Sequence, residues 1–463
     1  MKKLLCIALC LALLSGCAAP AAPTTEPRAN EVQITLSDSG IEFPADSGIE
    51  TTKEDIHTVV RITRPGTYRV SGSITAGQLA VDLGEDAAKD PNATVLLILD
   101  NAEIICRTGP AVLFRNVWES GVPNGLAGAH VLLTQGSKNR VVGVSTEEYD
   151  GAFYSRMSMK LDGAGSLRIE CGNEGLCSER HLTIDGGDIS ISSGNDGINA
   201  NADGESVITI NDGRLWIGVA GETGEGDGID SNGSVVINGG HIEAYACADS
   251  MDSGIDADLG IFLNGGTVIA TGNMLDRIED GGQTHAVFSF AQQQKAPYFT
   301  LKDLYGSTVL EAQTPSAFTN LLFSSPDITV GTYTLWSGET QYEGVTSVGG
   351  CGFAQLQPID RPEFPGKGDD GRVEIPPQPT QPIVTHGTPQ PPAEGDRPAD
   401  LPVPPMPPEG AENMPVPELP EGATPPKEAF DRQPVEIITG VLSTEFTVKE
   451  GGNYFTNVRA VEK

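Results

Sequence analysis

A short motif of glycine, one aliphatic residue and flanking carboxylate or carboxamide side chains recurs along the chain. Its three clearest copies are Gly194-Asn195-Asp196-Gly197-Ile198-Asn199, Gly226-Asp227-Gly228-Ile229-Asp230 and Asp252-Ser253-Gly254-Ile255-Asp256. If these copies stack on one another, their carboxylates repel and raise one another's pKa. Hard divalent cations, Ca²⁺ above all, bind such sets of oxygen atoms. The motif therefore predicts Ca²⁺ ligands at eight positions: Asp196, Asn199, Asp227, Asp230, Asn232, Asp252, Asp256 and Asp258.

A solvated acidic face that binds no ion is the alternative interpretation of these residues. The motif lacks the bidentate Glu of an EF-hand loop, and no His lies in it, so neither an EF-hand nor a transition-metal site is predicted. Ser253 stands where the neighbouring copies carry Asp196 and Asp227, so that copy lacks one carboxylate.

Tight turns of the Asp-Gly or Asn-Gly type follow the motif at a nearly constant distance. The spacing from motif glycine to turn glycine is 11 residues in three copies: Gly175 to Gly186, Gly228 to Gly239, and Gly254 to Gly265. The Gly197 copy is longer by four residues, Ala202-Asp203-Gly204-Glu205. A regular repeat with one local insertion is typical of a stacked architecture.

Two further alignments favour stacked parallel strands. The aliphatic position of the motif is occupied by Leu176, Ile198, Ile229 and Ile255, and two residues later every copy has a small residue, Ser or Ala. Side chains two residues apart on a strand face the same side, so both sets would line one interior. We therefore predict an all-β parallel β-helix. Ordinary antiparallel hairpins or low-complexity sequence are the alternatives, because Asp-Gly and Asn-Gly also mark hairpin turns.

Composition and hydrophobic patterning divide the chain into six segments. They are a lipoprotein signal peptide (1–16), a lipidated tether (17–50), the parallel β-helix (51–285), a C-terminal β cap (286–354), a disordered Pro-rich segment (355–434) and terminal strands expected to pair with the cap (435–463).

The N-terminal residues predict export and membrane anchoring. An apolar run from Leu4 to Leu14 follows two lysines and is too short to span a bilayer. The sequence Leu14-Ser15-Gly16-Cys17 is typical of a bacterial lipobox, which predicts lipid attachment at Cys17 and a place at the cell surface. An ordinary secretory signal that contains a cysteine is the alternative.

The net charge limits the possible partners of the chain, and the cysteine count limits its possible disulfides. A formal net charge of −34 excludes nucleic acid as a partner, because phosphate binding needs a basic face. Five cysteines follow Cys17, an odd number: Cys106, Cys171, Cys177, Cys247 and Cys351. Cys171 and Cys177 could form a disulfide or remain buried free thiols. No oligomeric state is indicated.

Several sequence blocks resemble one family of bacterial proteins. They are Val95 to Ala102, Tyr149 to Ser155, Leu161 to Leu167 and Leu182 to Gly187, together with the Asp-Gly-Ile steps. The chain resembles, over roughly residues 55 to 350, the bacterial carbohydrate-binding domain family typified by a clostridial cell-surface protein that binds acidic plant polysaccharides. This resemblance implies a right-handed parallel β-helix like that of pectate lyases, bound calcium, and binding of polygalacturonate or cellulose-like glycans.

The resemblance leaves three function classes to weigh. A binding protein would use calcium to bridge its own carboxylates to those of an acidic polysaccharide, with Trp216 and Tyr245 as weak candidates for stacking on sugars. A polysaccharide lyase of the same fold would need a base beside the acidic motif, yet Arg180 is the nearest candidate and lies outside it. A structural surface stalk or adhesin is the third class. We expect a binding protein without enzymatic activity.

Overall fold

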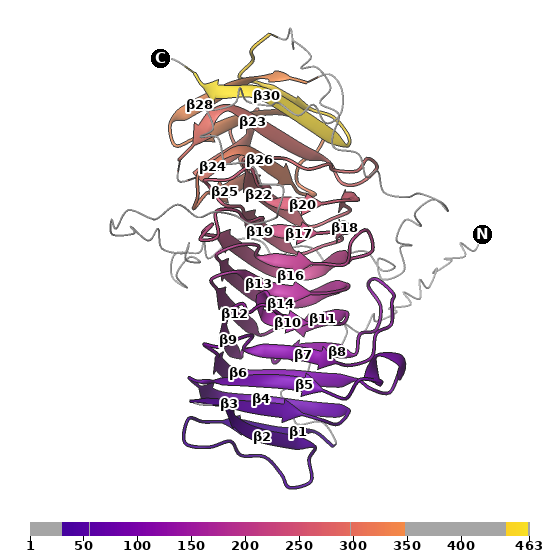
Figure 1. Cartoon of the computed structure of the whole chain (residues 1–463). Coiled ribbons are helices and arrows are strands. Elements are labelled where there is room, and N and C mark those ends of the chain that lie inside the picture. Colours follow the sequence, from indigo (N-terminus) through magenta and orange to yellow (C-terminus); the bar gives the residue numbers. More distant parts are fainter. Residues whose placement is uncertain (1–29, 55, 297, 348–440, 462–463) are drawn as a thin grey trace, which may run out of the picture.

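In a computed structural model of the chain, residues 30–54, 56–296, 298–347 and 441–461 are described (Figure 1). The predicted signal peptide, Cys17 and the predicted Pro-rich segment 355–434 lie outside the described residues.

One of the two sheets contains nine short strands stacked along the long axis of the molecule. Their order in the sheet follows the chain: β2 (Ile49–Glu54), β3 (His57–Ile62), β5 (Gly77–Asp82), β7 (Val112–Asn116), β10 (Gly151–Ser155), β13 (Glu174–Ser178), β15 (Ile198–Ala200), β17 (Ile229–Ser231) and β20 (Ile255–Ala257). β2 and β3 are antiparallel, whereas every later pair is parallel.

The other sheet contains 21 strands, and its first part is also built from parallel pairs. The strands of this part are β1 (Val32–Leu36), β4 (Gly66–Ile74), β6 (Val95–Ile105), β8 (Ala129–Leu133), β9 (Lys138–Gly143), β11 (Met159–Gly163), β12 (Ser166–Cys171), β14 (Leu182–Ser193), β16 (Val207–Val219), β18 (Ser234–Ile237), β19 (His241–Tyr245), β21 (Gly260–Leu263) and β22 (Thr267–Gly272). A single 3-10 turn, η1 (Ala87–Lys89), interrupts the described part of this region.

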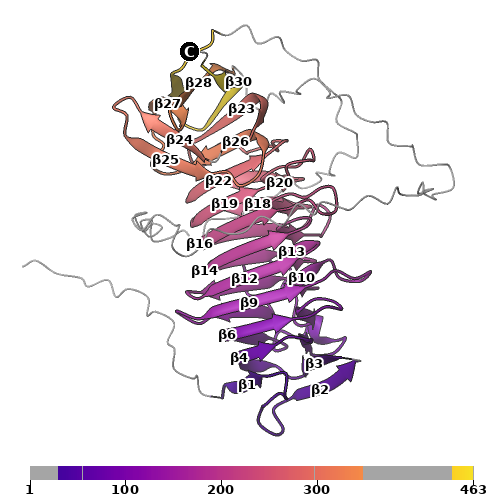
Figure 2. The same ribbon diagram turned by 90° about the vertical axis from the view of Figure 1, so that its left-hand side faces the viewer.

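The same sheet continues into antiparallel strands at the opposite end of the molecule (Figure 2). β22 pairs in parallel with β19 and antiparallel with β26, so it joins the two patterns. The remaining strands are β23 (His285–Gln294), β24 (Tyr298–Asp303), β25 (Thr308–Gln313), β26 (Phe318–Ser324), β27 (Gly331–Ser337), β28 (Thr340–Thr346), β29 (Phe446–Val448) and β30 (Gly452–Ala460). β29 pairs with β27, and β30 pairs with β28 and β23, so residues distant in sequence complete this end.

Two large cores and one smaller buried cluster, which contains Tyr154 and Cys177, hold the described strands together. A long aliphatic core runs through the stacked region, because alternate side chains such as Leu167 and Ile169 of β12 point inward and are buried. An aromatic core fills the antiparallel end, where Phe288 stacks on Phe455 with ring centroids 5.2 Å apart. Burial of these apolar side chains is the main favourable term in the folding free energy.

The predicted fold class needs correction. The all-β class is confirmed, but a right-handed parallel β-helix with a separate cap is wrong as a description of the whole chain. The strands form a 21-stranded sheet that mixes parallel and antiparallel pairs and a nine-stranded sheet that begins with an antiparallel pair. The repeat spacing predicts how neighbouring copies pair. It does not predict how the sheets begin, end and join.

The described cysteines are all free thiols. Cys106, Cys171, Cys177 and Cys247 are buried and none forms a disulfide, while Cys351 lies outside the described residues. Within the part of the chain that the structure describes, no helix is long and apolar enough to cross a membrane.

Candidate functional site

Close packing of the backbone requires glycine in the repeated motif. A Cβ atom added at Gly197 would lie 2.1 Å from Cγ2 of Ile217 and 2.6 Å from the carbonyl oxygen of Gly228. At Gly228 it would lie 2.4 Å from the carbonyl oxygen of Gly254. Neither glycine has a positive φ, so the requirement comes from close approach of stacked strands and not from a left-handed turn.

The stacked strands align the motif side chains into columns. Ile198 pairs with Ile229, and Ile229 with Ile255, so the aliphatic residues form one buried inner column. The neighbouring outward column is Cys177, Asn199, Asp230 and Asp256. A third column, just before the motif glycines, contains Glu174, Asp196, Asp227 and Ser253. Alternation along each short strand thus places Asn199, Asp230 and Asp256 on the face opposite the aliphatic residues. Asp196, Asp227 and Ser253 precede β15, β17 and β20, so the turns and not strand alternation position them.

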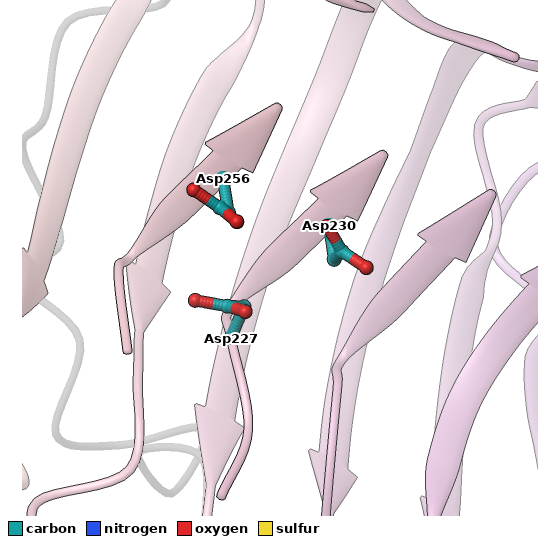
Figure 3. A group of neighbouring side chains, drawn as sticks. All are labelled: Asp227, Asp230 and Asp256. Atoms are coloured by element: carbon teal, nitrogen blue, oxygen red, sulfur yellow. The ribbon is translucent and has the colours of Figure 1, made fainter. Parts of the chain in front are cut away.

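Three of the predicted ligands converge on one point at the outer face of β17 and β20. Asp227, Asp230 and Asp256 each offer a carboxylate oxygen, and these three atoms lie within 4.8 Å of one another (Figure 3). Asp230 and Asp256 project from the neighbouring strands, and Asp227 lies just before β17. All three side chains are partly buried. We call these three residues the carboxylate cluster.

Burial and mutual repulsion raise the pKa values of the carboxylate cluster. Burial, followed by the charge of Asp256, raises the pKa of Asp227 to about 9. Burial and the charge of Asp196 raise the pKa of Asp230 to about 8. Burial and the charge of Asp276 raise the pKa of Asp256 to about 7. The charges that raise these values most are other carboxylates, so the cluster is electrostatically unfavourable when ionised.

A second group of oxygen atoms adjoins the carboxylate cluster. The Asn199 amide donates to Oε1 of Glu174 at 3.0 Å and to Oδ2 of Asp196 at 3.1 Å. This leaves Oδ1 of Asn199 and Oε2 of Glu174 buried with no hydrogen-bond donor. Burial raises the pKa of Glu174 to about 7 and that of Asp196 to about 6. Two buried oxygens without a donor are costly, and a cation is one partner that would satisfy them.

The remaining predicted ligands lie at the margin of this region. The Asn232 amide donates to the carbonyl oxygen of Asn201 and to Oδ1 of Asp203. Asp252 accepts hydrogen bonds from the backbone N–H of Gly226 and from the hydroxyl of Ser250. Asp258 is exposed. None of these three belongs to the carboxylate cluster.

Sequence reasoning missed Asp276. Its carboxylate accepts the backbone N–H of Ala257 at 3.0 Å, and it is the charge that raises the pKa of Asp256 most. Burial raises the pKa of Asp276 as well. Asp276 follows β22 outside the repeated motif, so no periodic signal marked it.

The two aromatic candidates are core residues. Trp216 is 5% exposed and Tyr245 is fully buried, and their ring centroids lie 6.1 Å apart within the aromatic core. The hydroxyl of Tyr245 donates to Oε2 of Glu243 at 2.7 Å. Neither ring therefore offers an exposed face for stacking on a sugar.

Comparison with known proteins bears on the identity of the chain. A family model described as "Carbohydrate-binding domain-containing protein" matches residues 57–295, just over half of the 463 residues. A protein of the same description from Acetivibrio thermocellus is 27% identical over 133 residues, which are 28% of this chain and 44% of that relative. The match therefore spans less than half of the relative's length.

A search of solved structures finds a polysaccharide lyase-like protein from C. thermocellum, solved as a gadolinium derivative. It matches with a TM-score of 0.39 and 20% identity, and the match covers 51% of this chain and 89% of that one. The extent of the family-model match confirms the resemblance drawn from the sequence: the chain belongs to the carbohydrate-binding domain family.

Proposed function

We propose that this member of the carbohydrate-binding domain family is a surface-anchored lipoprotein that uses Ca²⁺ to bind an acidic, polygalacturonate-like polysaccharide without cleaving it. The observation that carries the proposal is the carboxylate cluster, in which three carboxylate oxygens lie within 4.8 Å of one another. Lipid attachment at Cys17 and location at the cell surface are proposed from the N-terminal sequence alone.

The residues present suit calcium. The cluster offers only oxygen atoms, which hard divalent cations prefer. Asp227, Asp230 and Asp256 would hold the ion, and the unpartnered Oδ1 of Asn199 supplies a further oxygen nearby. Burial, and after it repulsion between carboxylates, raises the three pKa values, and a bound cation would stabilise the ionised carboxylates against both effects.

Calcium would also reconcile the acidic chain with an acidic ligand. A protein with a formal charge of −34 repels a polyanion at long range. A divalent cation held by partly exposed carboxylates supplies positive charge and further coordination positions at the surface. Carboxylates of the polysaccharide are suitable ligands for those positions, so the same residues would give both affinity and selectivity for uronate sugars.

Four basic residues of the stacked region favour binding over cleavage. Arg156, Lys160, Arg168 and Arg180 pair with Glu148, Asp185, Glu170 and Glu205, respectively. None of these acidic partners belongs to the carboxylate cluster. A lyase needs a base beside the bound uronate to remove the α-proton. The pairing of these cations away from the cluster therefore supports a binding role.

Incubation with polygalacturonate and Ca²⁺ tests this proposal. The full chain should be retained on the polysaccharide, and the ultraviolet absorbance of unsaturated product should stay at the level of a protein-free control. Rising absorbance would overturn the non-enzymatic part of the proposal. Lack of retention in Ca²⁺ would overturn the binding part.

A further inference from the structure

A buried arginine lies where the described chain enters the fold. Arg69 on β4 is 6% exposed, and its guanidinium donates two hydrogen bonds to the carboxylate of Glu31, the residue just before β1. The Nε to Oε1 distance is 2.5 Å and the Nη2 to Oε2 distance is 3.2 Å, so the pairing is bidentate. The Glu31 side chain is 0% exposed. This pair and the carboxylate cluster lie toward opposite ends of the parallel stack (Figure 1).

The same guanidinium also reaches two further strands. Its Nη1 donates to Oδ2 of Asp100 on β6 at 2.9 Å and to Oγ1 of Thr134, directly after β8, at 3.0 Å. β4 pairs with β6, and β6 pairs with β8, so these contacts cross consecutive strands of one sheet. Arg69 therefore joins the start of β1 to three strands. We call Glu31, Arg69, Asp100 and Thr134 the arginine clamp.

The position of β1 determines how a pull on the N-terminal segment reaches the fold. β1 lies at the end of the stack that is remote from the antiparallel end (Figure 1 and Figure 2). A chain anchored by lipid at Cys17 would be pulled at Glu31, whereas a polysaccharide on the carboxylate cluster would pull on β17 and β20. The load then runs along the stack and across its strands, in the direction in which neighbouring strands hydrogen-bond.

A load in this direction peels β1 from one end. β1 pairs with β4 over five residues in register, from Val32 to Leu36. Because the load enters at the N-terminal end of β1, these residues separate from β4 one after another, and each step opposes the load with only part of the pairing. The contact of Glu31 with Arg69 must break first. Charged bidentate hydrogen bonds are stronger than neutral ones, and separation would leave a buried charge without its partner.

We propose that the arginine clamp is a load-bearing attachment, which keeps β1 docked when the membrane anchor and a bound surface polymer pull in opposite directions. The inference rests on the proposed lipid anchoring and polysaccharide binding. Arg69 distributes the load over β4, β6 and β8, so the aliphatic core behind these strands stays closed under tension. An ordinary buried ion pair would stabilise the fold to the same extent whatever the direction of pull.

Magnetic-tweezers measurements on the full chain, with neither Ca²⁺ nor polysaccharide present, test this role. One handle is attached at Cys17, and the other replaces the side chain of Tyr305, which is 95% exposed between β24 and β25 in the antiparallel end. At constant force, Glu31→Gln should raise the rate of the first opening step by roughly a hundredfold, because Arg69 loses a charged, buried partner. Arg69→Lys should also raise this rate, because an ammonium group keeps the charge but cannot form the bidentate pair.

Two controls separate load bearing from ordinary stability. Moving the first handle from Cys17 to Ile56, which is 76% exposed between β2 and β3, sends the load into those strands instead of β1. With this attachment, Glu31→Gln should open at the wild-type rate. Glu170→Gln is the matched variant, because Glu170 lies on β12 within the stack and accepts from Arg140 at 2.9 Å. It should open at the wild-type rate with either attachment.

Three results would overturn the arginine clamp. The first is an equal rate of first opening in the wild type, Glu31→Gln and Arg69→Lys when the handle is at Cys17. The second is an equal acceleration by Glu31→Gln with both attachments, which would make Glu31 an ordinary stabilising residue. The third is an acceleration by Glu170→Gln as large as that by Glu31→Gln. Failure of the proposed function is detected separately, because retention on polygalacturonate is measured without force and these opening rates are measured without polysaccharide.

Discussion

At the scale of single residues, one position in each repeat packs in the aliphatic core, and its neighbours carry the carboxylates of the candidate site. Ile229 is fully buried in the aliphatic core, whereas Asp230, the next residue, faces outward into the carboxylate cluster. Gly228 lets the stacked backbones approach closely enough to bring Asp227 and Asp256 together. The packing role and the ligand role are therefore separable by substitution.

Replacement of a cluster carboxylate should weaken calcium binding. Asp227→Ala and Asp230→Ala should each raise the Kd for Ca²⁺ by about tenfold or more, because each removes a charged ligand. Asp185→Ala is the control, since Asp185 pairs with Lys160 and accepts from Asn211 outside the cluster. Calorimetric titration of Ca²⁺ measures the effect, and equal Kd changes in all three variants would contradict the assignment.

Replacement of the motif glycine should destabilise the fold. The Cβ of Gly197→Ala would lie 2.1 Å from Ile217 Cγ2, and overpacking of this kind costs about 1–3 kcal/mol. Gly109→Ala is the matched control, because its Cβ would meet its nearest atom at an ordinary 3.5 Å. Urea denaturation gives the free energy of unfolding of both variants, and equal values would show that the close approach at Gly197 is unimportant.

At the scale of elements, very short strands are sufficient because they pair with their neighbours in the stack: β15 and β17 each pair with a strand on both sides, and β20 pairs with β17. β15, β17 and β20 contain three residues each, yet they place Asn199, Asp230 and Asp256 in one column. The polarity of the column increases along the stack. It begins with Tyr154 and Cys177 and ends with Asn199 and the two aspartates. The polar end of this column is where charge accumulates.

The accumulated charge makes stability depend on pH. The pKa values of Asp227, Asp230 and Asp256 in the folded protein, about 9, 8 and 7, lie above the ordinary value of 3.8. The folded state therefore binds more protons than the unfolded state in this window, and stability is lost as the pH rises from about 4 to about 9. Ca²⁺ binds the ionised carboxylates, so it should reduce this loss.

Thermal melting between about pH 5 and about pH 9 measures the effect. In EDTA the melting temperature should fall across this range, and in Ca²⁺ it should fall less. Asp230→Asn should flatten the EDTA curve, because the amide cannot ionise. Identical curves in EDTA and Ca²⁺ would remove the calcium assignment.

At the scale of the whole molecule, the parallel stack and the antiparallel end form one continuous sheet through β22. The sequence predicted the pairing of Ile198 with Ile229 and of Ile229 with Ile255, because the same motif in each repeat fixes which residues align. It did not predict the mixed sheet, because the antiparallel pairing of β22 with β26 depends on contacts between residues about fifty positions apart that share no repeat.

The candidate site, like the fold, was predicted only in part. Periodicity identified Asp227, Asp230 and Asp256, which do converge. It also included Asn232, Asp252 and Asp258, which bond elsewhere or lie exposed. Asp276 escaped because no motif surrounds it. Trp216 was a weak candidate for stacking on a sugar, but it packs in the aromatic core of the antiparallel end and is buried there.

Membrane anchoring is a property of the whole chain that the N-terminal sequence predicts. Cys17→Ala should move the protein from the membrane fraction to the soluble fraction of cells, because the acyl chains would no longer be attached. Immunoblotting of the two fractions measures this, with Ser15→Ala as the control. Retention of Cys17→Ala in the membrane fraction would contradict lipid attachment at this cysteine.

The most direct test of the account is retention of the full chain on immobilised polygalacturonate, compared between Ca²⁺ and EDTA and between the wild type and the Asp227→Ala/Asp230→Ala double variant. The wild type should be retained in Ca²⁺ and released by EDTA. The double variant should not be retained in either buffer, while Asp185→Ala should behave as the wild type. Retention of the wild type in EDTA, or undiminished retention of the double variant in Ca²⁺, would contradict the claim that the carboxylate cluster binds acidic polysaccharide through calcium.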